Sequence, residues 1–432
     1  MAFEMSEERL EKGLLITHIK DDKFSTESIV VCFLLELNEQ TVQSFTAMIS
    51  MLAETNAKYP DKALLARRQA QLYGASLSSI SYRMGDTLDV GLSVYGIDDR
   101  CTIDGEGVTK DCAQLLLDCI FEPDIKNGKF NESVFESKKR ELIDRIKSSA
   151  DNRQAYAARR ARELAFVGEP AAVSLLGTLE NAQALTNEQL VESYQKMLDE
   201  AFISITFCGG GRNTEAQQLV AERFVKLAGQ RDFKGKDLKS LSAPSAHKDK
   251  PVTVTESIEQ AQSKLFMYYK TKGENPAAEQ VACALFGGTP FSKLFTNVRE
   301  KLSLCYYCQS AMVEAKSAMA VASGVAQGNE KKAADEIVCQ LEELKKGNFT
   351  DSDLENTKRS IIDSYRTIYD AVDELSSWYF TRFALGDTLS PNDMADIISG
   401  VTREQVVEAA NGFELDTVFT LLPLEKDGEI NE

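Results

Sequence analysis

The chain repeats a pattern of helices and strands in its two halves, and this repeat constrains its fold more than any other feature. Phe130–Glu136 resembles Phe349–Glu355, which lies 219 residues later, and Leu185–Glu192 resembles Val401–Glu408 at an offset of 216. In the second pair a Thr is followed two residues later by Glu and then by an apolar run, which is typical of a helix start. Each copy of that pair precedes a β-rich segment. Two coincidental amphipathic helices are the alternative, but matched order and offset favour a duplicated domain.

The composition changes between residues 230 and 250, which are rich in Lys, Ser, Asp and Gly. Such a composition is typical of a linker. We therefore predict an N-terminal domain at 1–229, a linker at 230–250 and a C-terminal domain at 251–432. Strands and helices are mixed in both halves, so the predicted fold class is α+β, with two homologous α/β-sandwich domains.

Leu88, Val90, Leu92 and Val94 alternate with more polar residues that include Asp89. This alternation predicts a half-buried strand at 87–94 with one face on the core.

Charge and hydropathy exclude several classes of protein. The 432 residues carry a formal net charge of −18, so no basic excess is present to bind nucleic acid nonspecifically. The longest apolar run is far shorter than the roughly 20 residues that span a membrane, and the N-terminus lacks the order of a signal peptide. Nine scattered cysteines are read as reduced thiols of a cytoplasmic protein.

The segment from residue 285 to 307 is the strongest candidate for a functional site. The pair Gly287-Gly288 forms a predicted turn before a short helix with Arg299, and a strand begins at Tyr306. A guanidinium and a phenol can donate hydrogen bonds to a peptide carbonyl or a developing oxyanion. The alternative is a salt bridge between Arg299 and Glu300 beside a core tyrosine.

This segment resembles the second-domain signature of the insulinase/pitrilysin-type zinc peptidases, through Gly-Gly, Ser-Lys-Leu-Phe, Val-Arg-Glu-Lys and Leu-Cys-Tyr in that order. The resemblance covers most of the chain and implies one half of a clamshell. It implies that Arg299 and Tyr306 face a zinc site across a chamber as catalytic groups, and that Gly287 and Gly288 lie in the substrate-binding segment.

The zinc motif of that family, His-x-x-Glu-His, is degenerate in this chain. Tyr59-Pro60, the Gly-Ala pair at 74–75 and the strand at 87–94, in the place of the family's edge strand, set the alignment. Thr46 and Ser50 then occupy the two His positions, and Ile49 occupies the Glu position. The third ligand position falls near Arg145, with Glu141 and Asp144 close by in the sequence. These residues supply neither a ligand set nor a general base, so we expect no metal and no cofactor in this chain.

The resemblance therefore predicts a zinc-less subunit of a heterodimeric metallopeptidase, of the kind found in bacteria. Its partner would be a homologous subunit that holds zinc, and Arg299 and Tyr306 would act in trans on a peptide substrate. The alternative is a homodimeric peptide-binding or scaffold protein without peptidase activity. We expect this chain to bind neither nucleic acid nor a membrane.

Two weaker motifs have structural explanations. Cys305-x-x-Cys308 has no partner pair, and on a regular strand its sulfurs would point to opposite faces. Gly209-Gly210-Gly211 lacks the residues of a phosphate loop and predicts a simple turn.

Overall fold

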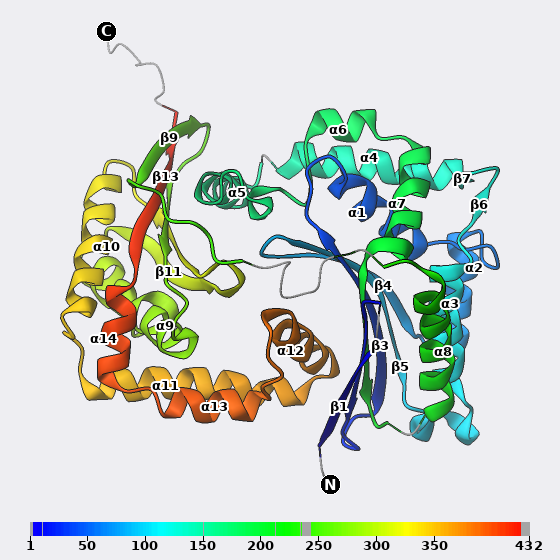
Figure 1. The fold of residues 1–432 in the computed structure, drawn as a ribbon. Helices are drawn as coiled ribbons and strands as arrows, with labels where there is room; N and C mark the ends of the chain where they lie inside the picture. The colour runs from blue at the N-terminus through cyan, green and yellow to red at the C-terminus, as the bar shows by residue number, and fades with distance from the viewer. Residues whose placement is uncertain are drawn as a thin grey trace. The chain divides into compact units, whose positions relative to one another are not determined.

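The computed structural model describes residues 3–10, 12–149, 151–211, 213–233, 235 and 243–424. They form two compact units (Figure 1). Unit 1 comprises Met1–Lys147, Val173–Ser242 and Ile368–Thr388, and unit 2 comprises Ser148–Ala172, Ala243–Thr367 and Leu389–Glu432. Each unit thus contains a segment from the other half of the sequence, whereas the division expected from the sequence used contiguous ranges.

A mixed six-stranded sheet forms the centre of unit 1, in the order β1-β2-β8-β3-β5-β4. Its strands are β1 (Glu4–Leu10), β2 (Leu14–Lys20), β3 (Thr26–Glu36), β4 (Ser76–Met84), β5 (Thr87–Ile97) and β8 (Phe202–Gly209). The pairs are antiparallel except β2 with β8, which are parallel.

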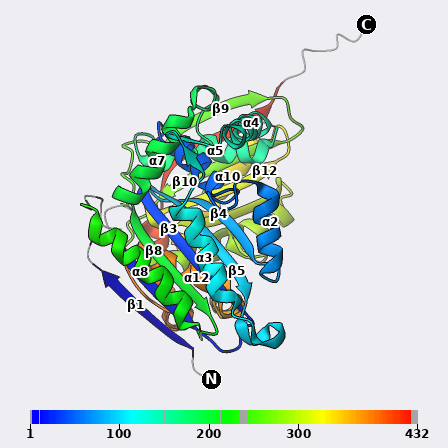
Figure 2. The ribbon, with the colours of Figure 1, turned by 90° about the vertical axis from the view of Figure 1, so that its right-hand side faces the viewer.

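Helices cover the apolar outer face of this sheet, as Figure 2 shows for α3 and α8. Its alternate residues, such as Val31, Phe33 and Leu92, join the main core. The helices of unit 1 on this side and around it are α1 (Val42–Leu52), α2 (Lys62–Gln71), α3 (Val108–Phe121), α4 (Glu132–Ser149), α6 (Leu179–Ala184), α7 (Asn187–Glu200) and α8 (Thr214–Gln230). A small hairpin of β6 (Ile125–Lys126) and β7 (Lys129–Phe130) precedes α4.

A helix from the second half of the sequence covers the opposite, inner face. Helix α12 (Val372–Leu385) packs on β3 and β8. Leu375 and Tyr379 lie against Ile19 and Cys208, and Phe380 and Phe383 lie against the cluster around Leu15. Because this inner face is covered, β5 is buried on both faces from Thr87 to Val94. The expectation of a half-buried strand there is wrong.

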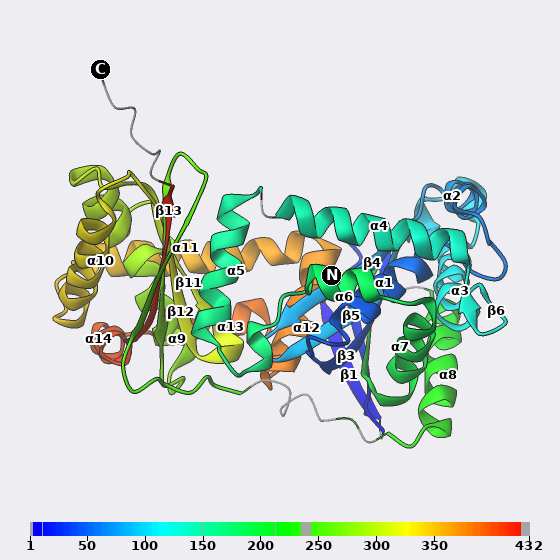
Figure 3. The same cartoon turned by 90° about the horizontal axis from the view of Figure 1, so that it is seen from above.

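Unit 2 contains a five-stranded sheet in the order β11-β12-β10-β13-β9. Its strands are β9 (Val252–Ile258), β10 (Ser263–Lys270), β11 (Cys305–Val313), β12 (Ala318–Val325) and β13 (Glu414–Pro423). Helix α5 (Arg153–Ala165), from the first half of the sequence, packs on β10 and β13 (Figure 3). The remaining helices are α9 (Pro276–Cys283), α10 (Glu330–Lys345), α11 (Asp351–Thr367), α13 (Pro391–Ser399) and α14 (Arg403–Asn411), with π-helical turns at Ala284–Gly288 and Leu294–Lys301.

The repeated sequence blocks adopt matching local structures. Thr186 begins α7 with a capping box to Gln189, and Thr402 begins α14 with a capping box to Gln405. Each helix leads into a strand that pairs in parallel with an earlier strand of the same sheet, β8 with β2 and β13 with β9. The predicted α+β class with two sheet-containing units is confirmed.

The position of the edge strand differs from the expectation. Strand β5 at 87–97 is interior, and β4 stands at the end of the sheet order among the described strands. The sequence of β4, Ser-Leu-Ser-Ser-Ile-Ser-Tyr-Arg-Met, gives a weak strand signal because serines occupy four of its positions. Within the described residues, no helix combines the length and apolarity that a membrane-spanning segment requires.

Candidate functional site

Helix α1 carries the three positions that correspond to the degenerate zinc motif. The Thr46 hydroxyl donates to the Gln43 carbonyl at 3.3 Å, and the Ser50 hydroxyl donates to the Ala47 carbonyl at 2.8 Å. Both hydroxyls are thus engaged within their own helix. Ile49, at the position of the general base, is 0% exposed in the core. The structure therefore places Thr46 and Ser50 at a cavity and Ile49 in the core.

The structure brings Thr46 and Ser50 together with Arg145. All three line a cavity of about 320 Å³ between α1, α4 and the edge strand β4, together with Lys138 and Glu141. The sequence thus located this site, although no residue type at these positions signalled it. Lys138 was missed because a lysine on an amphipathic helix resembles a solvated surface residue.

Lys138 lines this cavity as a half-buried cation. Its ammonium lies 2.8 Å from a Glu54 carboxylate oxygen and 2.9 Å from Glu141, and its side chain is 14% exposed. Burial opposes the charge, but the two carboxylates together raise the pKa of Lys138. Lys62 also binds Glu54, at 2.9 Å. The negative charges of Glu54 and Glu141, which could otherwise attract a metal cation, are therefore already paired with lysines.

These residues do not fit a zinc ion. The hydroxyls of the motif positions are poor zinc ligands, and Lys138 and Arg145 place two positive charges in the same cavity. Among the residues that the structure describes, no group of three or more His, Cys, Asp or Glu is arranged to hold a metal.

Arg299 lies on the π-helical segment Leu294–Lys301 of unit 2, and its side chain is 41% exposed. The guanidinium carbon lies 4.7 Å above the Phe295 ring, and Nε lies 3.6 Å from a Glu300 carboxylate oxygen. A stacked guanidinium keeps its outer donors free to bind a planar acceptor. The salt bridge expected as the alternative is thus present, and it leaves the side chain partly open to solvent.

Tyr306 stands at a β-bulge near the start of β11, which lies at one end of the sheet order of unit 2. Cys305 pairs with Val325 and Tyr307 with Gly324, so two residues on β11 advance the register by one on β12. Tyr306 is 65% exposed and is not a core tyrosine. Bulges re-aim side chains, and this one turns the phenol away from the packed faces.

The bulge also changes the geometry of Cys305 and Cys308. A regular strand would place them on opposite faces, and that expectation is wrong, because both thiols are buried and hydrogen-bonded to one another. The Cys308 thiol, with a smaller contribution from the Arg299 charge, lowers the pKa of Cys305. Arg299 therefore lies close enough to Cys305, the neighbour of Tyr306, to act on it electrostatically.

The two glycines before this segment differ in their surroundings. A Cβ on Gly287 would lie 2.7 Å from the Ser310 backbone nitrogen and 2.7 Å from a Leu294 methyl carbon. Gly287 is buried, so its small size lets the turn approach β11. Gly288 is exposed, and a Cβ there would meet the Ala284 Cβ at 3.3 Å.

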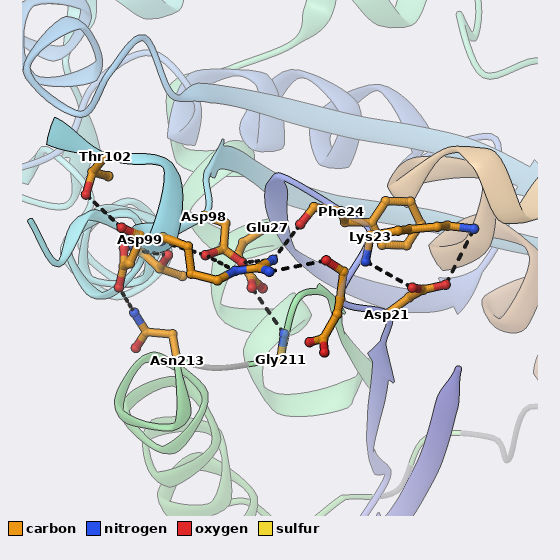
Figure 4. A network of polar contacts seen from close by, with 12 residues as sticks. Asp21, Lys23, Phe24, Glu27, Asp98, Asp99, Thr102, Gly211 and Asn213 are labelled. Carbon is orange, nitrogen blue, oxygen red and sulfur yellow. Dashed lines mark hydrogen bonds and ion pairs between the residues drawn. The ribbon is translucent and has the colours of Figure 1, made fainter. Parts of the chain in front are cut away.

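The glycine turn after β8 packs against carboxyl groups (Figure 4). The Gly211 amide donates to Glu27 at 3.2 Å, and Asp98 is held by Arg100 through Nε at 2.9 Å and an outer nitrogen at 2.8 Å. Burial, then the Asp98 charge, raises the pKa of Glu27 to about 8. A carboxyl cluster repels phosphate, in agreement with the expected simple turn.

The chain is similar to known proteins that are described as inactive peptidases. The family described as the peptidase M16 inactive domain matches residues 184–361. The chain is 26% identical over 425 residues to a Bacillus subtilis protein named probable inactive metalloprotease YmfF, covering 96% of this chain and 98% of that protein.

Solved structures match over the whole fold. A conserved protein from Enterococcus faecalis has a TM-score of 0.89 at 27% identity, covering 98% of this chain and 100% of that one. A peptidase M16 inactive domain from Pseudomonas fluorescens has a TM-score of 0.79 at 16% identity, covering 99% and 100%. The latter shows a shared fold. Residues 184–361 thus match the peptidase M16 inactive domain, and over nearly its full length the chain is similar to a protein named as a probable inactive metalloprotease, in agreement with the degenerate zinc motif.

Proposed function

We propose that this chain is the zinc-less subunit of a two-chain insulinase-type peptidase, cytoplasmic in location. The chain binds peptide substrate and supplies Arg299 and Tyr306 to a zinc site on a homologous partner subunit. The observation that carries this proposal is the contrast between the two motifs. The motif positions Thr46, Ile49 and Ser50 hold no zinc ligand and no general base. Arg299 and Tyr306, in contrast, are hydrogen-bond donors whose side chains are exposed to solvent.

The exposure of Tyr306 argues for a role outside the chain. A tyrosine left 65% exposed on a strand buries little apolar surface, so packing within the fold does not explain its position. Its position at a bulge gives the phenol a direction that the regular strand would not provide.

In the proposed complex Arg299 and Tyr306 donate hydrogen bonds to the carbonyl of the scissile peptide as its oxygen gains negative charge. Such donors act by being fixed before the reaction, so they lower the barrier without reorganising. Stacking on Phe295 restrains the Arg299 guanidinium in this way. Gly287 and Gly288 contribute the turn that positions the segment against β11.

The alternative is a homodimer that binds peptides or serves as a scaffold without cleaving them. The loss of the zinc positions is equally compatible with it. The two proposals differ in the partner, because the first requires a second chain that contains His-x-x-Glu-His.

The first experiment is affinity purification of the tagged full chain from its source cells, followed by mass spectrometry. The proposal expects a near-stoichiometric partner of similar length that bears His-x-x-Glu-His. Recovery of this chain alone, as a dimer, would replace the proposal with the homodimer.

The second experiment measures kcat/KM of the reconstituted pair on a fluorogenic peptide. We expect Arg299→Ala and Tyr306→Phe each to lower it by about 10²-fold, the scale for removing one oxyanion donor. Arg366→Ala is the matched control, since Arg366 is a surface arginine of α11 with a 68% exposed side chain. If Arg299→Ala behaves like this control, the role of Arg299 in trans is refuted.

A further inference from the structure

Unit 1 holds a second cavity, of about 670 Å³, between the inner face of its sheet and helix α12. This volume lies within the range of small-ligand pockets. Strands β3, β4, β5 and β8 contribute one wall and α12 contributes the other. The edge strand β4 borders both this cavity and the smaller one at the degenerate zinc motif.

Asp89 on β5 lines this cavity as a buried acceptor that the described residues do not satisfy. The residue is 2% exposed, and its Oδ1 accepts no hydrogen bond within the described part of the chain. Burial raises the pKa of Asp89 to about 7, against a hydrogen bond with the Cys32 thiol that lowers it. A buried acceptor without a donor is costly, so a ligand that donates a hydrogen bond to Asp89 would be favoured in this cavity.

The other charged and titratable groups of the cavity favour a cation as that donor. Asp373 and Glu374, in the first turn of α12, are exposed at its α12 side. Tyr82 and Tyr95 lie on the strands, and Arg83 lines the wall and donates to the Val173 carbonyl at 3.0 Å. With Asp89 ionised, three carboxylates face one guanidinium, so the field attracts positive charge.

A peptide bound along strand β4 could place a cationic side chain in this cavity. It is the outer strand of the sheet, and an extended peptide can add to an outer strand through main-chain hydrogen bonds. Alternate side chains of an added strand point to the same face as alternate residues of β4. Tyr82 pairs with Asp89 and Ile80 with Gly91, so these residues share the face of the cavity.

We propose that this cavity is a specificity pocket for the Lys or Arg side chain of a peptide lying extended along β4, with Asp89 as its counter-charge. The proposal rests on the peptide binding proposed above and adds a substrate class to it. It concerns unit 1 of this chain alone, so it can be tested without the partner subunit.

The test uses three fluorescein-labelled hexapeptides that are identical except for one central residue, which is Arg, norleucine or Glu. Fluorescence anisotropy with the purified full chain gives the three Kd values. We expect the Arg peptide to bind about tenfold or more tightly than the norleucine peptide, the scale of a hydrogen bond to a charged group. Glu should bind most weakly.

Asp89→Asn should abolish the preference for Arg while leaving the norleucine Kd unchanged. Asp118→Asn is the matched control, because Asp118 is a buried carboxylate of α3 outside this cavity. A measurement on the wild-type chain needs no variant: the preference for Arg should strengthen between pH 6 and pH 8, as Asp89 ionises.

Equal binding of all three peptides, unchanged by Asp89→Asn, overturns the pocket and leaves the proposed peptide binding standing. No binding of any peptide to the isolated chain overturns the pocket as well, and the partner purification then judges the subunit proposal by itself. A preference for Arg without a partner in the cell supports the pocket and the homodimer.

Discussion

The carboxyl pair Glu27 and Asp98 predicts that unit 1 loses stability as the pH rises through neutrality. Glu27 is 8% exposed and accepts a hydrogen bond from the Gly211 amide. Arg100 keeps Asp98 ionised and lowers its pKa against the effect of burial, so Glu27 takes the proton that the pair shares. The pKa of Glu27 is about 8 in the folded state, against an ordinary value of 4.5.

The sign follows from proton binding. Between pH 4.5 and 8 the folded state holds the Glu27 proton and the unfolded state has lost it. The free energy of unfolding therefore falls with rising pH in this window, by at most about 1.4 kcal/mol per pH unit. From pH 5.5 to 7.5 the loss amounts to about 2 kcal/mol, because both states are partly titrated near the ends of the window.

Glu27→Gln tests this reasoning because a glutamine amide resembles the protonated carboxyl. It can donate to Asp98 and accept from Gly211 at every pH. We expect the variant to match the wild type at pH 5.5 and to exceed its free energy of unfolding by about 2 kcal/mol at pH 7.5. Asp89 titrates in both proteins, so its contribution cancels in the difference.

The assay is urea denaturation followed by the fluorescence of Trp378, the single tryptophan of the chain, which lies on α12 in unit 1. Glu54→Gln serves as a control of opposite sign. Lysines lower the pKa of Glu54 despite its burial, so this change should destabilise unit 1 at both pH values. A difference between Glu27→Gln and wild type that does not change with pH would refute the shared-proton account.

Three further predictions concern packing and buried cations. Gly287→Ala should destabilise unit 2 by about 1–3 kcal/mol in thermal denaturation, whereas Gly288→Ala should be nearly neutral; equal effects would contradict the close approach at Gly287. Arg231, 4% exposed, donates to four backbone carbonyls, so Arg231→Met should cost about 2–4 kcal/mol by Trp378 fluorescence, and a neutral result would refute this role. Burial lowers the pKa of Lys270 from 10.5 to about 8. Between pH 8 and pH 10.5 the folded state therefore binds fewer protons than the unfolded state. Hydrogen exchange of α5 should therefore slow as stability rises across this window, after correction for intrinsic rates, and Lys270→Met should remove that dependence.

Much of the fold was predictable because its signals are local. The capping boxes at Thr186 and Thr402 involve residues three positions apart, and the periodicity of α4 and α11 lies within each helix. Such patterns act before any tertiary contact forms. The degenerate metal positions were equally readable, since a zinc site requires particular residue types wherever the helix lies.

The candidate site was predictable only in part. The sequence located Thr46, Ser50 and Arg145, and the structure places them around one cavity. It did not locate Lys138 among them, because helix periodicity does not tell which partner faces a charged side chain. The roles of Arg299 and Tyr306 stay predictions, although their exposure agrees with them.

Only the tertiary structure decided what covers each face of the two sheets. The sequence of β5 determined an alternation, yet α12, which lies nearly 300 residues further along the chain, determines that Asp89 is buried. The exchange of α5 and α12 between the halves likewise depends on apolar surfaces that meet only in the folded chain. The bulge at Tyr306 brings Cys305 and Cys308 to one face through its pairing with β12. Local sequence thus determined the elements, and long-range burial decided which polar groups they hide.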